Sequence, residues 1–99
     1  MNTRITSVHF DADKKLIEFV NSRLNKLELF NDSIVGFEVF LKLENTSVED
    51  NKLVEIKVEV PGNDLFAKKQ SKSFEESTDD AIDALRKQLI KHKEKLRKD

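Results

Sequence analysis

Residues 34–44 have the sequence Ile-Val-Gly-Phe-Glu-Val-Phe-Leu-Lys-Leu-Glu, in which every second residue from the valine onward is apolar. Because side chains alternate between the two faces of a β-strand, this period of two predicts a long strand with one buried face. Residues 54–60, Val-Glu-Ile-Lys-Val-Glu-Val, repeat the pattern, and the polar segment 45–52 predicts a hairpin that pairs the two strands antiparallel. The residues of the first strand expected to be buried are Val35, Phe37, Val39, Leu41 and Leu43.

A strand and a helix are expected before this pair. Residues 4–10 favour β-structure and lack a helical period, which predicts an opening strand. Asp11 or Asp13 can accept hydrogen bonds from the first turn of a following helix. The apolar residues of that helix recur at spacings of four, four and three, so they form one stripe. They are Leu16, Val20, Leu24 and Leu27.

A turn, a fourth strand and a long helix are expected after the pair. Pro61 and Gly62 are residue types that preset the dihedral angles of turns, and a strand with weak alternation is expected at residues 65–72. Ser73 and Glu76 have the spacing of a capping box, so a helix is expected to begin there. Its predicted apolar stripe consists of Phe74, Thr78, Ala81, Ile82, Leu85, Leu89, His92 and Leu96.

These elements define a fold class. Their order is β-α-β-β-β-α, and a sheet with one polar face needs cover on the other face. We therefore predict an α+β two-layer sandwich, in which two helices pack on one face of a four-stranded mixed sheet. A chain of 99 residues is expected to form one core, so residues 1–99 are predicted to be a single domain.

The composition disfavours several classes of protein. The chain has no cysteine, which rules out a disulfide framework and fits a reducing compartment, so we expect a cytoplasmic protein. The first ten residues lack the apolar stretch of a signal peptide. No apolar run approaches the roughly 20 residues of a membrane span, so no membrane partner is expected.

Charge is unevenly distributed along the chain. The formal net charge is only −1, so the molecule as a whole should not be drawn to polyanions. Residues 44–64 contain six acids and two lysines, whereas residues 86–98 contain seven basic residues and one acid. The basic residues of this cationic end are Arg86, Lys87, Lys91, Lys93, Lys95, Arg97 and Lys98.

This cationic end favours a binding function, because lysine and arginine at several helical angles can reach phosphates along an RNA surface. The alternative is that the cations complement the dipole of the helix, which accounts for about two or three charges. From residue chemistry alone the two interpretations have about equal support.

The first helix offers a second cationic flank. Phe19, Arg23 and Lys26 lie together by helical angle, and an exposed aromatic ring beside cations could stack on an unpaired base. A phenylalanine at the edge of an apolar stripe is more often peripheral core. We expect the cations of the two helices to converge into one continuous positive ridge.

Catalysis is not expected. The only histidines are His9 and His92, and His92 lies in the apolar stripe, where a histidine is more often a boundary core residue than a general base or ligand. The acids within residues 79–83 lack the spacing and the glycine of a calcium loop. Two glycines cannot form a loop that cradles phosphates. We therefore expect no metal, no cofactor and no small-molecule substrate.

Two parts of the sequence resemble a known family. Residues 81–96, Ala-Ile-Asp-Ala-Leu-Arg-Lys-Gln-Leu-Ile-Lys-His-Lys-Glu-Lys-Leu, are similar to the last helix of the short-form ribosome hibernation promoting factors, also called ribosome-associated translation inhibitors. Residues 17–20, 23 and 26–28 are similar to the first helix of that family. The resemblance covers the whole chain.

The resemblance implies a fold akin to double-stranded-RNA-binding domains. It also implies a protein that occupies the messenger and transfer RNA channel of the small ribosomal subunit and reversibly inhibits translation under stress or starvation. His92 fills a position that the family often gives to an aromatic residue or a histidine, and we include it among the RNA-binding residues. The residues that the resemblance places on ribosomal RNA phosphates are Arg23, Lys26, Arg86, Lys87, Lys91, Lys93 and Lys95.

The chain departs from the family pattern at the start of the last helix. The family commonly has Asp-x-Tyr there, whereas this chain has Ser-Phe-Glu at residues 73–75 and no tyrosine. The chain ends at Asp99, without the extra domain by which long members pair two ribosomes, so pairing would need another hibernation factor. The alternative function is a protein–protein adaptor that uses the open sheet face, with Glu38, Lys42, Glu55, Lys57 and Glu59.

Overall fold

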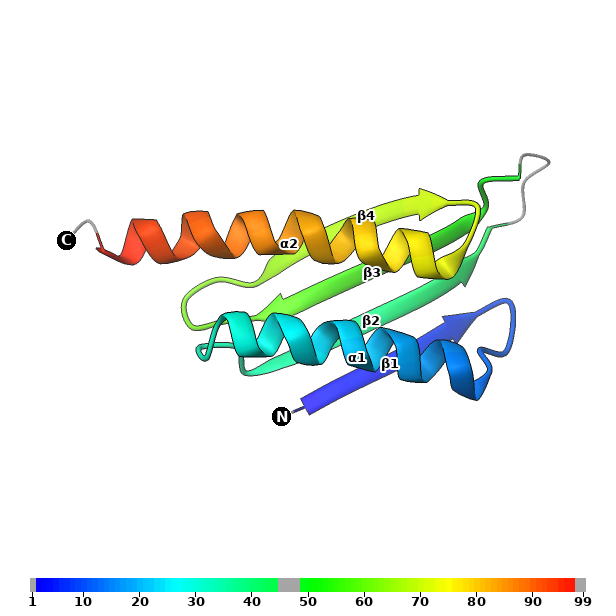
Figure 1. The fold of residues 1–99 in the computed structure, drawn as a ribbon, viewed down its shortest axis with the longest axis horizontal. Helices are drawn as coiled ribbons and strands as arrows, with labels where there is room; N and C mark the ends of the chain where they lie inside the picture. The colour runs from blue at the N-terminus through cyan, green and yellow to red at the C-terminus, as the bar shows by residue number, and fades with distance from the viewer. Residues whose placement is uncertain (1, 45–48, 98–99) are drawn as a thin grey trace.

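The computed structural model of this protein describes residues 2–44 and 49–97, with side chains described as far as Glu94. Its elements follow the predicted order, and both helices lie side by side on one face of the sheet (Figure 1). Residues 45–48 of the predicted hairpin lie outside the described residues. The elements are β1 (Asn2–Val8), α1 (Lys14–Phe30), β2 (Gly36–Leu43), β3 (Lys52–Glu59), β4 (Leu65–Ser71) and α2 (Phe74–Arg97).

The sheet has the strand order β1-β2-β3-β4 and is mixed. β1 and β2 pair in parallel because α1 carries the chain back along the sheet between them. β2 with β3 and β3 with β4 pair antiparallel. In Figure 1, α1 lies over the β1–β2 half of the sheet and α2 over the β3–β4 half.

The core lies between the helices and the sheet. All four predicted stripe residues of α1 are buried, and so are the first six of α2, from Phe74 to Leu89. Burying one large apolar side chain stabilises the fold by about 1.5–3 kcal/mol, so these stripes fix both helices on the sheet. His92 is only half-buried, and the side chain of Leu96 lies outside the described ones. The sheet residues at the centre of this core are Phe37, Val39, Leu41, Val54, Ile56 and Val58.

Both helix caps use the side chains expected from the sequence. Asp13 Oδ1 accepts a hydrogen bond from the Leu16 N–H at 2.8 Å, which caps α1. Ser73 Oγ accepts from the Glu76 N–H at 3.1 Å, which is one half of the predicted capping box. The N–H of Ser73 donates instead to Ser71 Oγ at 3.4 Å, because that hydroxyl lies two residues away at the end of β4.

All four strands differ from the prediction by one or two residues at their ends, and for β1 and β2 the structure shows the cause. β1 spans Asn2–Val8 rather than residues 4–10, because His9 has a positive φ of 69° and turns the chain out of the sheet. Phe10 then stacks on Phe74, with 4.6 Å between ring centroids. β2 begins at Gly36, so Val35 lies beyond the paired part of β1 and is 54% exposed, not buried.

Gly36 permits the parallel pairing of β1 with β2. It lies opposite Asn2, and a Cβ atom at this glycine would lie 2.7 Å from the Asn2 carbonyl oxygen and 3.3 Å from the Asn2 Cβ. Contact with a backbone oxygen cannot be relieved by rotating a side chain. A larger residue at this position must therefore push the two strands apart.

We predict that Gly36→Ala lowers the free energy of unfolding by about 1–3 kcal/mol, as overpacking does in other proteins. Urea denaturation followed by circular dichroism measures the change. Val35→Ala, at the exposed neighbouring position, serves as the control and should change stability by less than about 1 kcal/mol. If the two variants unfold at equal urea midpoints, the close approach of β1 to β2 is contradicted.

Candidate nucleic-acid interface

A shallow trough of about 260 Å³ lies between α1 and α2, and we call it the interhelical trough. It forms because one flank of each helix faces the other helix. The α1 flank repeats at spacings of four, three and four, from Phe19 to Phe30. The residues that line the interhelical trough are Arg23, Lys26, Asp79, Ile82, Asp83 and Arg86.

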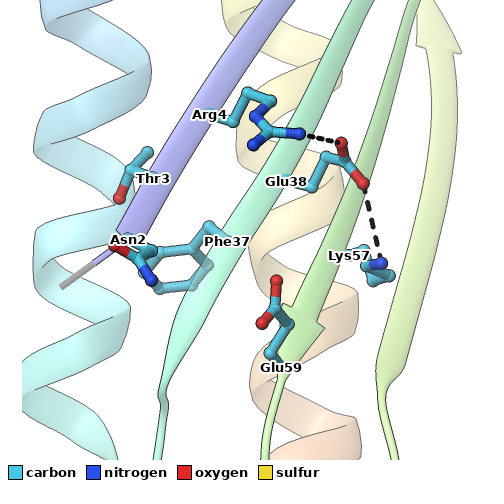
Figure 2. A pocket seen from close by; sticks show the side chains of 7 residues that line it. All are labelled: Asn2, Thr3, Arg4, Phe37, Glu38, Lys57 and Glu59. Carbon is cyan, nitrogen blue, oxygen red and sulfur yellow. Dashed lines mark ion pairs between the residues drawn. The ribbon is translucent and has the colours of Figure 1, made fainter.

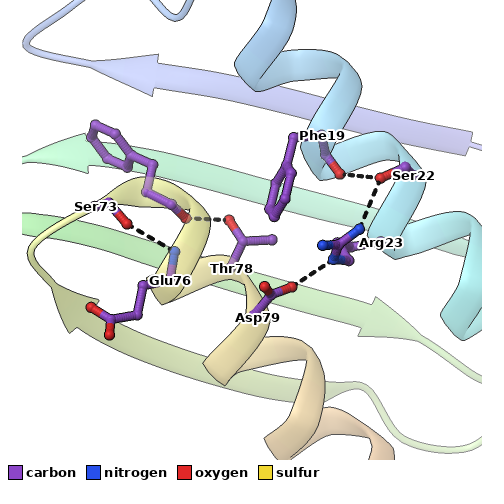
Figure 3. Close-up of polar contacts among 8 residues, drawn as sticks. Phe19, Ser22, Arg23, Ser73, Glu76, Thr78 and Asp79 are labelled. Carbon is purple, nitrogen blue, oxygen red and sulfur yellow. Dashed lines mark hydrogen bonds and ion pairs between the residues drawn. The ribbon is translucent and has the colours of Figure 1, made fainter.

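Arg23 bridges the two helices at one end of the trough. Its Nε donates to Asp79 Oδ1 at 2.6 Å, and its guanidinium carbon lies 4.2 Å from the centre of the Phe19 ring (Figure 3). The Arg23 side chain is 31% exposed and that of Asp79 is 50% exposed. Phe19 is half-buried beneath the guanidinium, in agreement with a peripheral core residue. The cation predicted to bind RNA is thus already held by a carboxylate.

The other end of the trough has no such bridge. The Arg86 guanidinium carbon lies 5.9 Å from the centre of the Phe30 ring, and Lys26 lies one helical turn before Phe30. Lys26 and Arg86 are exposed, and neither forms an ion pair with a described carboxylate. Phe30 was not among the predicted site residues, although its spacing from Lys26 placed it on the same flank.

Two cations of α2, Lys87 and Lys91, face the β4 side. Lys87 pairs with Asp83 at 3.5 Å, one helical turn earlier, and both side chains are more than half exposed. Lys69 of β4 lines a hollow together with Lys87. Sequence analysis did not single out Lys69, although its alternation with buried Ala67 and Ser71 indicated the helix-covered face. Lys91 lies near the turn between β3 and β4.

Three predicted residues lie near the end of α2. Lys93 is exposed, and the side chain of Lys95 lies outside the described ones. His92 is half-buried beside Leu65 and Asn63, and its Nε2 is enclosed without a hydrogen-bond partner among the described residues. This position agrees with a boundary core residue, and a contact between His92 and RNA stays a prediction.

The cations form a broad band across α2 rather than the continuous ridge expected from the sequence. Arg86 lies on the α1 side of the helix, while Lys87 and Lys91 lie toward β4. Asp83 lines both hollows and lies between these two sides, while Asp79 is paired with Arg23 in the trough. Acids on this surface reduce the positive potential locally.

The open sheet face has a different electrostatic character. Glu38 lies between two cations, 3.7 Å from Arg4 and 3.6 Å from Lys57, above a hollow near the start of β1 (Figure 2). Glu55 likewise lies between Lys42, at 3.3 Å, and Lys68, at 3.9 Å. The charges of this face are therefore largely satisfied by one another.

Within residues 2–44 and 49–97, no three histidine, cysteine, aspartate or glutamate residues gather closely enough to hold a metal ion. Neither helix has an apolar stretch of the length that a bilayer crossing requires.

Comparison with known proteins identifies the family. The family model described as "Sigma 54 modulation protein / S30EA ribosomal protein" matches residues 3–97. The ribosome hibernation promoting factor of Escherichia coli is 34% identical over 98 residues, which cover 98% of both chains. The chain belongs to this family. The family predicted from the two helix sequences is thereby confirmed.

Two solved structures have the same fold as this protein. A ribosomal subunit interface protein from Coxiella burnetii matches with a TM-score of 0.84 and 22% identity, over 94% of this chain and 98% of that chain. The N-terminal domain of Protein Y from Thermus thermophilus matches with a TM-score of 0.78 and 20% identity, over 93% and 99%. At these identities the likeness shows the α+β fold alone, and it confirms the predicted fold class.

The bond between Arg23 and Asp79 is expected to contribute little to stability. Both side chains are partly exposed, so we predict a coupling energy of about 0.2–1 kcal/mol. Arg23→Gln, Asp79→Asn and the double variant, compared by urea denaturation, measure this coupling. A coupling above about 2 kcal/mol would show that the bond is a major clamp between the helices, and that Arg23 is not available to a ligand.

Proposed function

We propose that this protein binds the small ribosomal subunit in the channel for messenger and transfer RNA, and that it reversibly inhibits translation under stress or starvation. Its family is described as a ribosomal protein, and its curated relatives are named ribosome hibernation promoting factors. Those names support ribosome binding and translation inhibition in the cytoplasm. Binding to the small subunit, and to its channel for messenger and transfer RNA, is the more specific part of the proposal.

One observation carries the choice of surface. α1 and α2 lie side by side, so the cations of both helices are displayed on the same side of the molecule (Figure 1). Phosphates that meet these cations release condensed counterions, which favours binding despite the net charge of −1. The open sheet face displays fewer unpaired cations, because four of its cations pair with Glu38 and Glu55. The exposed cations of the helical side that belong to the proposed contact surface are Lys26, Arg86, Lys87, Lys91 and Lys93.

Inhibition follows from occupancy in this proposal, with no reaction. A folded domain between RNA walls excludes messenger and transfer RNA by volume, and phosphate contacts hold it there. Arg23, His92 and Lys95 complete the proposed contact surface. Specificity comes from the fit of a rigid two-helix surface to a concave RNA, because folded RNA is recognised largely by shape. Pairing of two ribosomes would require a further hibernation factor.

We predict that affinity for isolated small subunits falls about a thousandfold between 50 and 200 mM salt, if about six phosphates are engaged. Co-sedimentation across a series of salt concentrations gives the slope of log affinity against log salt concentration. Binding that is absent at low salt, or that does not respond to salt, would contradict the proposal.

A pair of triple variants tests which face binds. The first variant changes Lys87, Lys91 and Lys93 together to glutamine. It should reduce the slope of log affinity against log salt concentration by about three, one for each lost phosphate contact. The matched control changes Arg4, Lys57 and Lys68 to glutamine, which removes the same charge from the open sheet face. Thermal unfolding checks that both variants fold. If only the control weakens binding, the open sheet face is the contact surface and the alternative adaptor function is supported.

A further inference from the structure

Large apolar side chains are exposed at the end of α1 and on the last part of α2. Leu29 and Phe30, the last two residues of α1, are 88% and 42% exposed. Ile90 of α2 is 42% exposed and lies one helical turn after Arg86, on the flank that faces α1. The long helix α2 continues past this point, beyond the end of α1 (Figure 1). Core packing does not account for these three residues.

The two ends of the trough contain the same pair of residue types, but only one of the two arginines is held by a carboxylate. Each end has an arginine over a phenylalanine ring, Arg23 over Phe19 and Arg86 over Phe30. At the first end Asp79 holds the guanidinium at 2.6 Å and the ring is half-buried (Figure 3). At the second end the ring is more exposed, and no described carboxylate pairs with Arg86. The second end is therefore open to a ligand.

We propose that this open end binds one unpaired RNA base, stacked on the Phe30 ring, and we call it the base platform (Leu29, Phe30, Arg86 and Ile90). The proposal rests on the proposed function and names the nucleotide state that one part of the surface recognises. An aromatic face accepts any base by stacking, and an arginine beside it can hold the adjoining phosphate or cover the base. Leu29 and Ile90 add exposed apolar surface on the same two helix segments.

The charge around the base platform favours RNA over a second copy of this chain. Lys26 lies one turn before Phe30 on α1, and Lys93 follows Ile90 by three residues on α2. Both are exposed. Two copies that met through this patch would bring these cations and Arg86 together, and like charges at an interface are unfavourable. A polyanion with exposed bases matches both the apolar and the cationic parts.

The test uses a single-stranded oligouridine RNA with one central 2-aminopurine, whose fluorescence is quenched when it stacks. The wild-type protein should quench it, Phe30→Leu should abolish the quenching and weaken binding about tenfold, and Phe30→Trp should restore both. Phe66→Leu is the matched control, because Phe66 is 51% exposed on the open sheet face. A duplex of the same length has no unpaired base, so its affinity should be equal for wild type and Phe30→Leu.

Three results would overturn the base platform. They are unchanged quenching in Phe30→Leu, an equal loss in Phe66→Leu, and a concentration-dependent dimer that Phe30→Leu abolishes in analytical ultracentrifugation. Co-sedimentation of the same proteins with small subunits separates this failure from failure of the proposed function. If the wild type sediments with small subunits but does not quench the 2-aminopurine, only the base platform is ruled out. Quenching without sedimentation keeps the base platform and removes the ribosomal assignment.

Discussion

Burial of two apolar helix stripes against one face of the sheet is the constraint on which the rest of the molecule depends. Leu24 and Leu27 of α1, with Leu85 and Leu89 of α2, are at most 1% exposed, and they fix the rotation of each helix about its own axis. Once the rotation is fixed, the flanks beside the stripes are fixed as well. The positions of the trough and of the basic band on the two helices are therefore consequences of core packing.

The open sheet face and the helical side differ in their electrostatic character, although the composition gives only one net charge for the whole chain. On the open sheet face, each of Glu38 and Glu55 lies between two cations, so little potential extends into solvent. On the helical side, the acids of α2 are concentrated in its first half and the cations in its second half, and the ion pairs of Arg23 and Lys87 are partly exposed. Exposed pairs are weak, so phosphates can compete for the same cations. A chain with a net charge of −1 can therefore bind a polyanion with one side only.

The two kinds of contact proposed for the helical side have complementary roles. Cations spread along α2 engage phosphates wherever a backbone runs, which gives affinity without regard to sequence. An aromatic ring at the end of the trough discriminates between paired and unpaired nucleotides, because only an unpaired base can stack on it. Together they suit a folded RNA in which helices and loops alternate. Family membership, through residues 3–97, makes ribosomal RNA the natural candidate.

The sequence by itself determined the elements, their order and most of their buried faces, and the resemblance of residues 81–96 to a known helix indicated the family. The period of two in residues 34–44 and the stripes of α1 and α2 suffice for the elements and their faces, because periodicity reports which side of its own element a residue occupies. Only the tertiary structure decided what lies opposite each residue. The bond from Arg23 to Asp79 joins residues 56 positions apart, and Lys69 meets Lys87 only because α2 packs over β4. The exposure of Phe30 and the parallel partner that makes Gly36 necessary have the same origin, since both depend on where distant segments end in space.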